Sequence, residues 1–327
     1  MKCFYYSRYR FYKPNIKHET KFFLISDIHF SPSVRSERLS AITEQARKLQ
    51  PDYTIIAGDL IDSLDAVDTE PKLNRLTAWL EQLGTVAPVF IALGNHDFYL
   101  KNPDYSGVFS KKRHWFTQKR HSYLSAISNI SNVTLLDNSS FEDRNAYLFG
   151  FTQSPEYFQF DRDDEHTTSF FHPGSEDLNI LLHDLKNLDP KLISNLPAHK
   201  AKIAIVHSPV HLSNPKVAAY FDEFDFIISG HMHSGVVLPG LSDFWKSDRG
   251  IVAPGKLLFP RNSRTHITSP NQKNIICGAV STIQDSAKPI TFLNGAFPVN
   301  IATLELTHHE PYARKPDIKH EYISFKS

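Results

Sequence analysis

The stretch FIISGHMH, residues 226–233, joins an apolar run to two histidines that lie one residue apart. In an extended chain, side chains two positions apart point to the same side, so His231 and His233 can approach one object together. Two imidazoles on one side are a common arrangement for binding a metal ion. The alternative is that a strand simply ends here and both rings face water. Other parts of the chain decide between the two interpretations.

Four other apolar runs end in residues of the same chemical kind. In order along the chain they are followed by DIH (27–29), GDLID (58–62), GNHD (94–97) and the single His207. Any one of these motifs could be an ordinary cap, a turn or a buried ring. Side chains just beyond the carboxyl ends of strands in an open α/β sheet, however, collect in one crevice. Five such motifs at five strand ends therefore favour a metal site.

The segments between the apolar runs predict an α/β fold. Apolar residues recur with helical spacing from Ser36, from about Pro71, over 176–188 and near 216–221. Strands alternating with helices indicate βαβ units, whereas the last eighty residues favour strands and loops. No repeat, linker or clean boundary interrupts the pattern, which predicts a single domain over residues 1–327. Loops or insertions are expected at about 98–128 and 152–175.

The composition limits the class of protein. The 327 residues are 41% hydrophobic, which is ample for a buried core. Lys and Arg (36) nearly cancel Asp and Glu (35), so no nucleic-acid partner is expected from net charge. The only cysteines, Cys3 and Cys277, form no metal-binding spacing, which excludes a thiolate site and a disulfide scaffold and fits a reducing compartment.

The N-terminal residues and the lack of long apolar runs predict a cytoplasmic location. No apolar run approaches the roughly 18 to 20 residues of a membrane span, and residues 1–14 lack the apolar segment of a signal peptide. No transmembrane segment is therefore expected. The alternating aromatic and basic residues at this terminus favour an edge strand, with peripheral contact with a membrane surface as the alternative.

The candidate ligands offer oxygen and nitrogen but no sulfur, which suits Mn, Fe, Zn or Mg. They number seven, too many for one ion but suitable for two: Asp27, His29, Asp59, Asn95, His207, His231 and His233. Two ions about 3.5–4 Å apart can share a carboxylate and a water, lower the pKa of that water to about 7, and clamp a phosphate for in-line attack by the bridging hydroxide. Asp59 is the candidate for the shared carboxylate. The pattern thus predicts a binuclear metal-dependent phosphoesterase.

In this order, DxH, GDxxD, GNHD, the strand-end His207 and GHxH resemble the calcineurin-like metallophosphoesterase superfamily over residues 21–235. The following segments, VVLPG (236–240) and GIVAPGKLLFPRN (250–262), resemble a bacterial branch of predicted phosphohydrolases, so the resemblance extends to about residue 306. Met232 and Ser234 stand where that branch usually has Thr and Gly. The membrane or export segment common at the N-terminus of that branch is also missing. Neither departure removes a ligand.

The resemblance implies a four-layer α/β/β/α sandwich, in which helices flank two mixed β-sheets and a binuclear site lies at the sheet edge. It implies that one ion is held by Asp27, His29, His233 and Asp59, and the other by Asn95, His207, His231 and Asp59. His96 would face the leaving group and stabilise or protonate the departing oxygen, and Asp97 would orient His96. Asp62 is expected to brace its loop rather than to bind metal.

Two alternatives to this enzyme fit the motifs less well. A catalytically silent metal-binding scaffold of the same fold would typically lack ligands or the GNH histidine, and all are present. A metal-dependent amide hydrolase would carry HxH on its first strand, where this chain has DxH. The other conspicuous histidines are expected to pack or face solvent: His183, His308 and His309. His211 is a weaker candidate for the pocket wall.

The substrate depends on residues around the metals. The segment after GNHD carries basic and aromatic side chains: Lys111, Lys112, Arg113, Trp115, Phe116, Lys119 and Arg120. They could bind a second phosphate or an acidic headgroup together with a base, sugar or acyl chain. They could equally form a solvated loop. The first interpretation predicts a small phosphodiester or pyrophosphate, nucleotide-linked or lipid-linked, over a phosphoprotein; a phosphomonoester, the native metal pair and the oligomeric state stay open.

Overall fold

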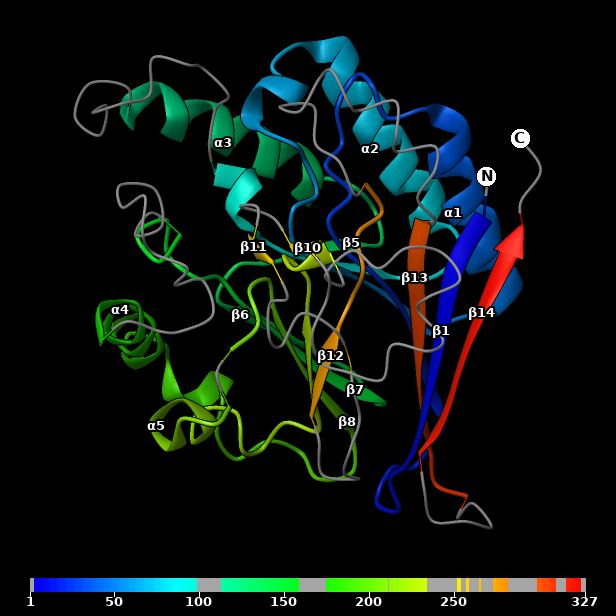
Figure 1. Cartoon of the computed structure of the whole chain (residues 1–327), viewed down its shortest axis with the longest axis vertical. Helices are drawn as coiled ribbons and strands as arrows, with labels where there is room; N and C mark the ends of the chain where they lie inside the picture. Colours follow the sequence, from blue (N-terminus) through cyan, green and yellow to red (C-terminus); the bar gives the residue numbers. More distant parts are fainter. Residues whose placement is uncertain are drawn as a thin grey trace.

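The computed structural model describes residues 3–98, 113–158, 175–210, 212–233, 252–253, 257–258, 265, 273–281, 299–309 and 316–324. Within these residues, two β-sheets face each other and helices cover their outer sides (Figure 1). Most of residues 234–298 lie outside the description, so the assignment of the whole chain to one domain stays a prediction.

The first sheet has seven strands in the order β14-β1-β13-β2-β3-β4-β5. Their bounds are β1 (Cys3–Tyr12), β2 (Thr20–Ile25), β3 (Tyr53–Ala57), β4 (Val89–Ala92), β5 (Val133–Leu136), β13 (Val299–Thr307) and β14 (Asp317–Ser324). Strands β2 to β5 are parallel, whereas β13 runs antiparallel to β2. The expectation that the N-terminal strand lies at an edge was wrong, because β14 pairs with its outer side.

The second sheet has five strands in the order β12-β9-β8-β7-β6. Their bounds are β6 (Ser139–Glu142), β7 (Ala146–Phe151), β8 (Ala201–Val206), β9 (Phe226–Ser229) and β12 (Asn274–Ile276). All neighbours are parallel except β6 and β7, which form an antiparallel hairpin. Two short strands, β10 (Val252–Ala253) and β11 (Leu257–Leu258), pair separately. Both of the sheets that face each other are thus mixed. Strands β2 to β5 of the first sheet are parallel to one another, as are β7, β8, β9 and β12 of the second.

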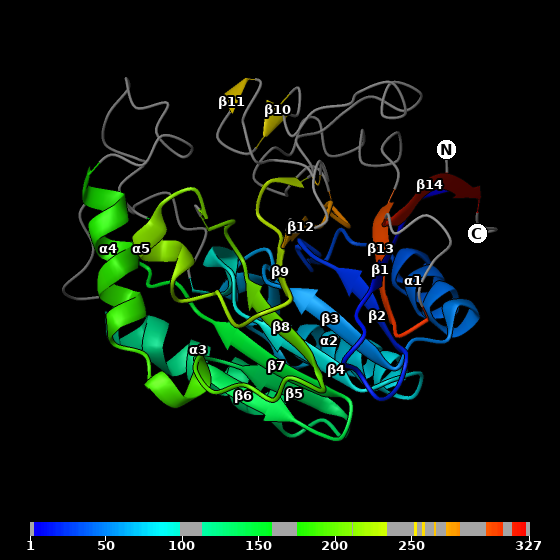
Figure 2. The same ribbon diagram turned by 90° about the horizontal axis from the view of Figure 1, so that it is seen from below.

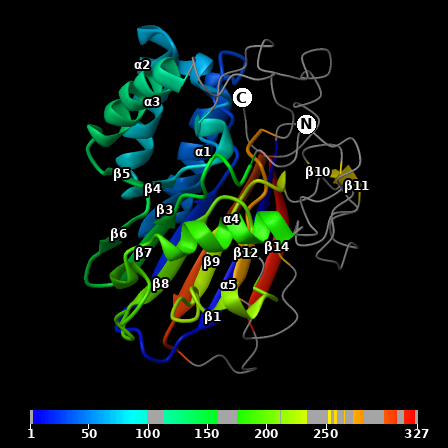
Figure 3. The same cartoon turned by 90° about the vertical axis from the view of Figure 1, so that its left-hand side faces the viewer.

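Helices pack on the outer sides of both sheets (Figures 2 and 3). On the first sheet they are α1 (Ser36–Leu49), α2 (Glu70–Gly84) and α3 (Arg113–Ser128), and on the second α4 (Ser175–Lys186) and α5 (Pro215–Ala218). The short 3₁₀ segments are η1 (Leu64–Val67), η2 (Asn95–Phe98) and η4 (Pro190–Leu192). Buried apolar side chains form three layers, one between the sheets and one under each group of helices. The predicted α/β/β/α sandwich is confirmed.

Helix α3 lies within residues 98–128, where the sequence predicted a loop. Residues 113–128 are helical, and the buried side chains on this helix include Tyr123 and Ile127. The apolar positions lie in its last two turns, whereas the preceding turns carry charged and aromatic residues. A short apolar stripe of this kind gives little helical periodicity, so the pattern resembled an irregular segment. The other expected insertion, 152–175, falls mostly on residues outside the description.

Candidate metal centre

Five loops at the carboxyl ends of strands from both sheets form one buried polar cluster. Strands β2, β3 and β4 of the first sheet lead to Asp27, Asp59 and η2, and strands β8 and β9 of the second lead to His207 and His231. Side chains from these loops form groups whose ligand atoms lie within 4.8 Å of one another. The predicted convergence of the strand-end motifs is therefore observed, across both sheets rather than along one.

The backbone of these loops has an unusual conformation. Among the described residues, nine non-glycine residues have a left-handed φ, and five of them are candidate ligands: Asp27, His29, Asp59, His231 and His233. This conformation costs L-residues energy, and such residues cluster at functional sites. Close packing adds a further constraint, because a Cβ on Gly230 would lie 1.8 Å from Ser26 Oγ. The strand ends are thus shaped to point polar side chains inward.

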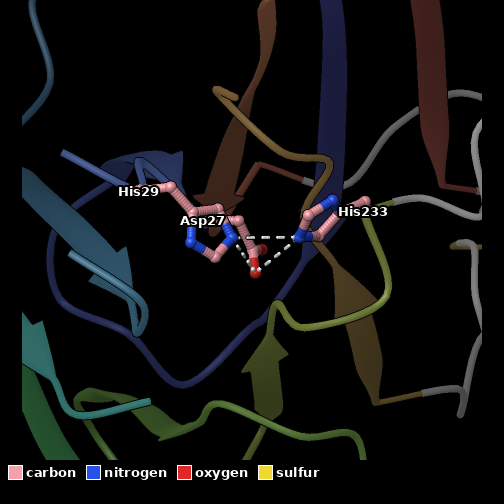
Figure 4. A group of neighbouring side chains, drawn as sticks. All are labelled: Asp27, His29 and His233. Atoms are coloured by element: carbon pink, nitrogen blue, oxygen red, sulfur yellow. Dashed lines mark hydrogen bonds and ion pairs between the residues drawn. The ribbon is translucent and has the colours of Figure 1, made fainter. Parts of the chain in front are cut away.

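The first ligand group consists of Asp27, His29 and His233 (Figure 4). His29 Nε2 lies 3.2 Å from His233 Nε2, and His233 Nε2 lies 3.4 Å from Asp27 Oδ1. Two ligands of one ion at about 2.1 Å would be about 3.0–3.4 Å apart, depending on the coordination angle. His29 Nε2 also lies 3.8 Å from Asp59 Oδ2, which places that carboxylate beside this group. The distances fit a shared ion.

The second group consists of Asp59, His207 and His231, with Asn95 beside it. His207 Nε2 lies 3.1 Å from Asp59 Oδ2, and His231 Nδ1 lies 3.1 Å from Asn95 Oδ1. His207 Nδ1 donates to the Ala57 carbonyl at 2.8 Å, which fixes the ring with Nε2 toward Asp59. Oδ2 of Asp59 thus lies near both groups, where a shared carboxylate would have to be.

The pKa values of the buried carboxylates also favour the binding of cations. Burial raises the pKa of Asp27, but His233 and neighbouring rings outweigh it and lower that pKa to about 2. The pKa of Asp59 is likewise held well below its usual value by His207 and His96, against the effect of burial. Burial lowers the pKa of His207, but Asp59 outweighs it and raises that pKa to about 9. The two buried carboxylates thus favour their ionised form, which is the form that binds a cation.

Three further rings of the site, His29, His96 and His231, have lowered pKa values, which favours the neutral form that binds a metal. Burial is the main cause in each ring: it lowers the pKa of His231 to about 3 and that of His29 well below its usual value. The pKa of His96 falls to about 4 for the same reason. Ionised carboxylates beside neutral imidazoles form the donor set that borderline divalent ions prefer. The residues present therefore fit a metal centre.

His96 is oriented by Asp62 rather than by Asp97. Its Nδ1 donates to the Asp62 carbonyl at 2.7 Å, and its Nε2 lies 3.9 Å from Asp59 Oδ2. The Asp62 carboxylate lies 3.8 Å from His29 Nδ1 and joins a third group with His29 and His96. Asp62, expected only to brace its loop, therefore contacts the site directly. Its position four residues after Gly58 in GDLID was the available signal.

Asp97 has a different set of partners from the one expected. Its carboxylate accepts hydrogen bonds from Gly94 N at 2.9 Å, Ile61 N at 3.2 Å and the Tyr123 hydroxyl at 3.0 Å. Burial, with Asp59 nearby, raises its pKa to about 6. Asp97 thus joins two loops and a helix, and any effect on His96 passes through the backbone between them.

The other residues singled out in the sequence lie elsewhere or outside the description. His183 is on α4 with an exposed ring, and the rings of His308 and His309 contact each other after β13 at 4.2 Å between centroids, as expected for histidines that pack or face solvent. His211 is not described, nor are Lys111, Lys112 and the side chains of residues 113–119. Arg120 is described, and its guanidinium lies over the Phe98 ring and pairs with Asp137 at 3.4 Å.

A family model described as calcineurin-like phosphoesterase matches residues 20–235. The chain belongs to this family. The match confirms the resemblance carried by the five strand-end motifs, with almost the same bounds. Membership in the calcineurin-like phosphoesterase family supports a metal-dependent hydrolase.

Curated relatives extend the comparison. The chain is 26% identical over 230 residues to an uncharacterized metallophosphoesterase of Campylobacter jejuni, covering 69% of this chain and 47% of that protein. It is 27% identical over 220 residues to a transmembrane protein with a metallophosphoesterase domain from Danio rerio, covering 66% of this chain and 40% of that protein. The chain spans less than half the length of these two relatives.

A dimetal phosphatase from Danio rerio is 14% identical, with a TM-score of 0.40 over 82% of this chain and 90% of that one. Within the part of this chain that the structure describes, no helix has both the length and the apolar character required to cross a membrane.

Proposed function

We propose that this chain is a binuclear metal-dependent phosphoesterase that hydrolyses a phosphoester or pyrophosphate bond of a small molecule. One observation carries the proposal: Asp59 Oδ2 lies 3.1 Å from His207 Nε2 in one ligand group and 3.8 Å from His29 Nε2 in the other. A single carboxylate between two sets of imidazoles is the arrangement that a pair of ions requires. The complete ligand set argues against a silent scaffold.

The residues divide between the two ions as the resemblance implies. Asp27, His29 and His233 would hold one ion, Asn95, His207 and His231 the other, and Asp59 both. Such ions supply a nucleophilic water at neutral pH and neutralise the developing phosphoryl charge. Oxygen and nitrogen donors suit Mn, Fe, Zn or Mg, and the native pair stays a prediction.

His96 is proposed to handle the proton of the leaving group. Because the Asp62 carbonyl can only accept, His96 Nδ1 carries a proton, and Nε2 is the nitrogen that faces Asp59 and the ligand groups. Burial keeps this ring neutral before substrate binds. An anionic phosphoester beside Nε2 would raise the pKa of His96 and let the ring gain a proton. That proton can then pass to the departing oxygen.

The class of substrate is inferred from the segment that follows η2. Arg120 is occupied by Phe98 and Asp137, so the cations available for a second phosphate or acidic headgroup are Lys111, Lys112, Arg113 and Lys119. Together with Trp115 and Phe116, they favour a small phosphodiester or pyrophosphate that carries a nucleotide or lipid group. This part of the proposal rests on sequence.

The test combines metal analysis with a substrate screen. Protein reconstituted with Mn²⁺ is assayed against phosphomonoesters, phosphodiesters and pyrophosphates, and the metal content of the same preparation is measured. We expect two ions per chain and hydrolysis of at least one class, with turnover of that substrate lowered on the order of 10²-fold in His96→Ala. Two bound ions with no hydrolysis of any class would favour the silent scaffold.

Replacing Lys111, Lys112 and Arg113 together by Ala tests the substrate class. The KM for the true substrate should rise, while hydrolysis of a minimal nitrophenyl ester should stay nearly unchanged. Equal effects on both substrates, or no effect on either, would show that these cations do not select the substrate.

A further inference from the structure

Three donors converge on the carboxylate of Asp97, and only one of them is a side chain. Gly94 N donates to Oδ2, while Ile61 N and the Tyr123 hydroxyl donate to Oδ1. The carboxylate is fully buried. A buried carboxylate is costly unless its oxygens accept hydrogen bonds, so each of these donors contributes to keeping it in place.

The two backbone donors lie in the loops that carry the candidate ligands. Gly94 directly precedes Asn95 and His96, and Ile61 follows Asp59 by two residues. The same loops are joined a second time, because His96 N donates to Asp59 Oδ1 at 2.8 Å. Asp97 therefore fixes the η2 turn against the loop of the shared carboxylate.

Tyr123 links this arrangement to helix α3. It lies 26 residues beyond Asp97, and its side chain is 2% exposed. One turn earlier on the same helix, Arg120 lies over the ring of Phe98, the last residue of η2, at 4.2 Å from the ring centroid. Two successive turns of α3 thus hold the two residues that follow His96.

We propose that Tyr123 is a positioning residue of the metal centre, whose hydroxyl holds Asp97 and thereby holds Asn95 and His96 in place. The backbone donors to Asp97 would be present with any side chain at position 123. The third hydrogen bond depends on the tyrosine alone, and without it one buried oxygen loses a partner that water cannot easily replace. Asn95 is two residues from Asp97, so loss of this bond should loosen the amide ligand of one ion most directly, with a smaller effect on the second ion through Ile61 and the loop of Asp59.

Tyr123→Phe tests the proposal, because it removes one oxygen and keeps the ring. The matched control is Tyr147→Phe, which removes a buried hydroxyl that donates to the Leu192 carbonyl at 3.0 Å on the outer side of the second sheet. Mn²⁺ is titrated into metal-free protein by calorimetry. In Tyr123→Phe the affinity for one of the two ions should fall by about 10-fold, as for other partners of ligand residues, while the affinity for the other ion should fall less. Tyr147→Phe should leave both affinities unchanged.

Kinetics give a second readout, which rests on the proposed function. In Tyr123→Phe, kcat for an ester with a poor leaving group should fall by on the order of 10-fold at unchanged KM, because His96 is displaced. Nitrophenyl esters should be affected less, since their leaving group departs without a proton. If the wild-type protein hydrolyses none of the esters, the proposed function fails, and the Mn²⁺ titration still decides the role of Tyr123.

Asp97→Asn provides a further test that does not depend on one variant folding well. If Tyr123 acts through Asp97, the protein that carries both Tyr123→Phe and Asp97→Asn should bind Mn²⁺ no more weakly than Asp97→Asn alone. Additive losses of affinity, or a lower melting temperature in Tyr123→Phe with both Mn²⁺ affinities unchanged, would show that Tyr123 only supports the packing of α3.

Discussion

The two ends of the sandwich are closed in different ways. At the amino ends of the parallel strands, the Tyr53 hydroxyl of the first sheet donates to Asp143 Oδ2 of the second at 2.6 Å. Beside it, Lys13 after β1 forms an ion pair with Asp225 before β9. In both of these contacts the polar groups that join the sheets have partners supplied by the chain itself.

The carboxyl end is different, because the described part of the chain supplies partners for only some of the buried polar groups there. The first sheet contributes the oxygen ligands there, and the second contributes only imidazoles. His207 Nε2 is buried without a hydrogen-bond partner among the described residues, although Asp59 lies 3.1 Å away. Cations would complete this end and would join the sheets through ligands from both. Metal content should therefore affect the carboxyl end and leave the amino end unchanged.

The largest expected effect is at the shared carboxylate. Asp59→Asn should retain fewer than one ion per chain, whereas His29→Ala and His207→Ala should each retain about one, because only Asp59 serves both ions. Activity of Asp59→Asn should fall by about 10³-fold or more as two ions are lost. Metal analysis after gel filtration measures the content, and equal retention in all three variants would contradict the assignment of Asp59 as the bridge.

His96 separates chemistry from metal binding at the same end. His96→Ala should keep both ions and lose on the order of 10²-fold in turnover of alkyl phosphoesters, as when a positioned acid is removed. The loss should be smaller for nitrophenyl esters. A variant that loses metal but keeps its rate per bound ion would assign His96 to the ligands instead.

Metal removal should weaken the link between the sheets. A ligand that binds only the folded state at about 100 times its Kd stabilises that state by about 2.7 kcal/mol. Chelation should therefore lower the melting temperature of the wild type but change that of Asp59→Asn much less. Identical shifts in both proteins would mean that the chelator acts elsewhere.

The position of the ligands at the strand ends also explains which features of the site could be predicted from the sequence. The ligand residues follow apolar strands directly, so local pattern and the rule for strand ends were sufficient to bring seven distant residues together. The left-handed conformation of Asp27 and His231 had no such signal, because it depends on packing between the two sheets. Helix α3 was not predicted because its apolar stripe is short. For the same reason, Tyr123 was not recognised as a partner of Asp97.

The partners of Asp62 and Asp97 were assigned wrongly from the sequence for a similar reason. Both follow a glycine of a motif by three or four residues, and the motifs alone do not state which carboxylate reaches which ring. The partner is set by the η2 turn, which directs His96 Nδ1 to the Asp62 carbonyl and buries Asp97 against α3. Spacing along the chain identifies candidates, whereas partners across loops require coordinates.

The smallest expected effect is at the amino end, where Asp143 accepts hydrogen bonds from Tyr53, Asn145 N and Ala146 N. Although burial raises it, these bonds hold the pKa of Asp143 below its usual value. A carboxyl whose pKa is lower in the folded state stabilises that state above its unfolded pKa of about 4, and this contribution is lost as the pH falls through the folded value.

Asp143→Asn should therefore cost about 1–2 kcal/mol at pH 7, with the difference from wild type shrinking below about pH 4. Urea unfolding at several pH values measures this, with Mn²⁺ titration of the same variant as the control. Because no candidate ligand group among the described residues includes Asp143, both Mn²⁺ affinities should match the wild type, and a change in either would show that the two ends are coupled.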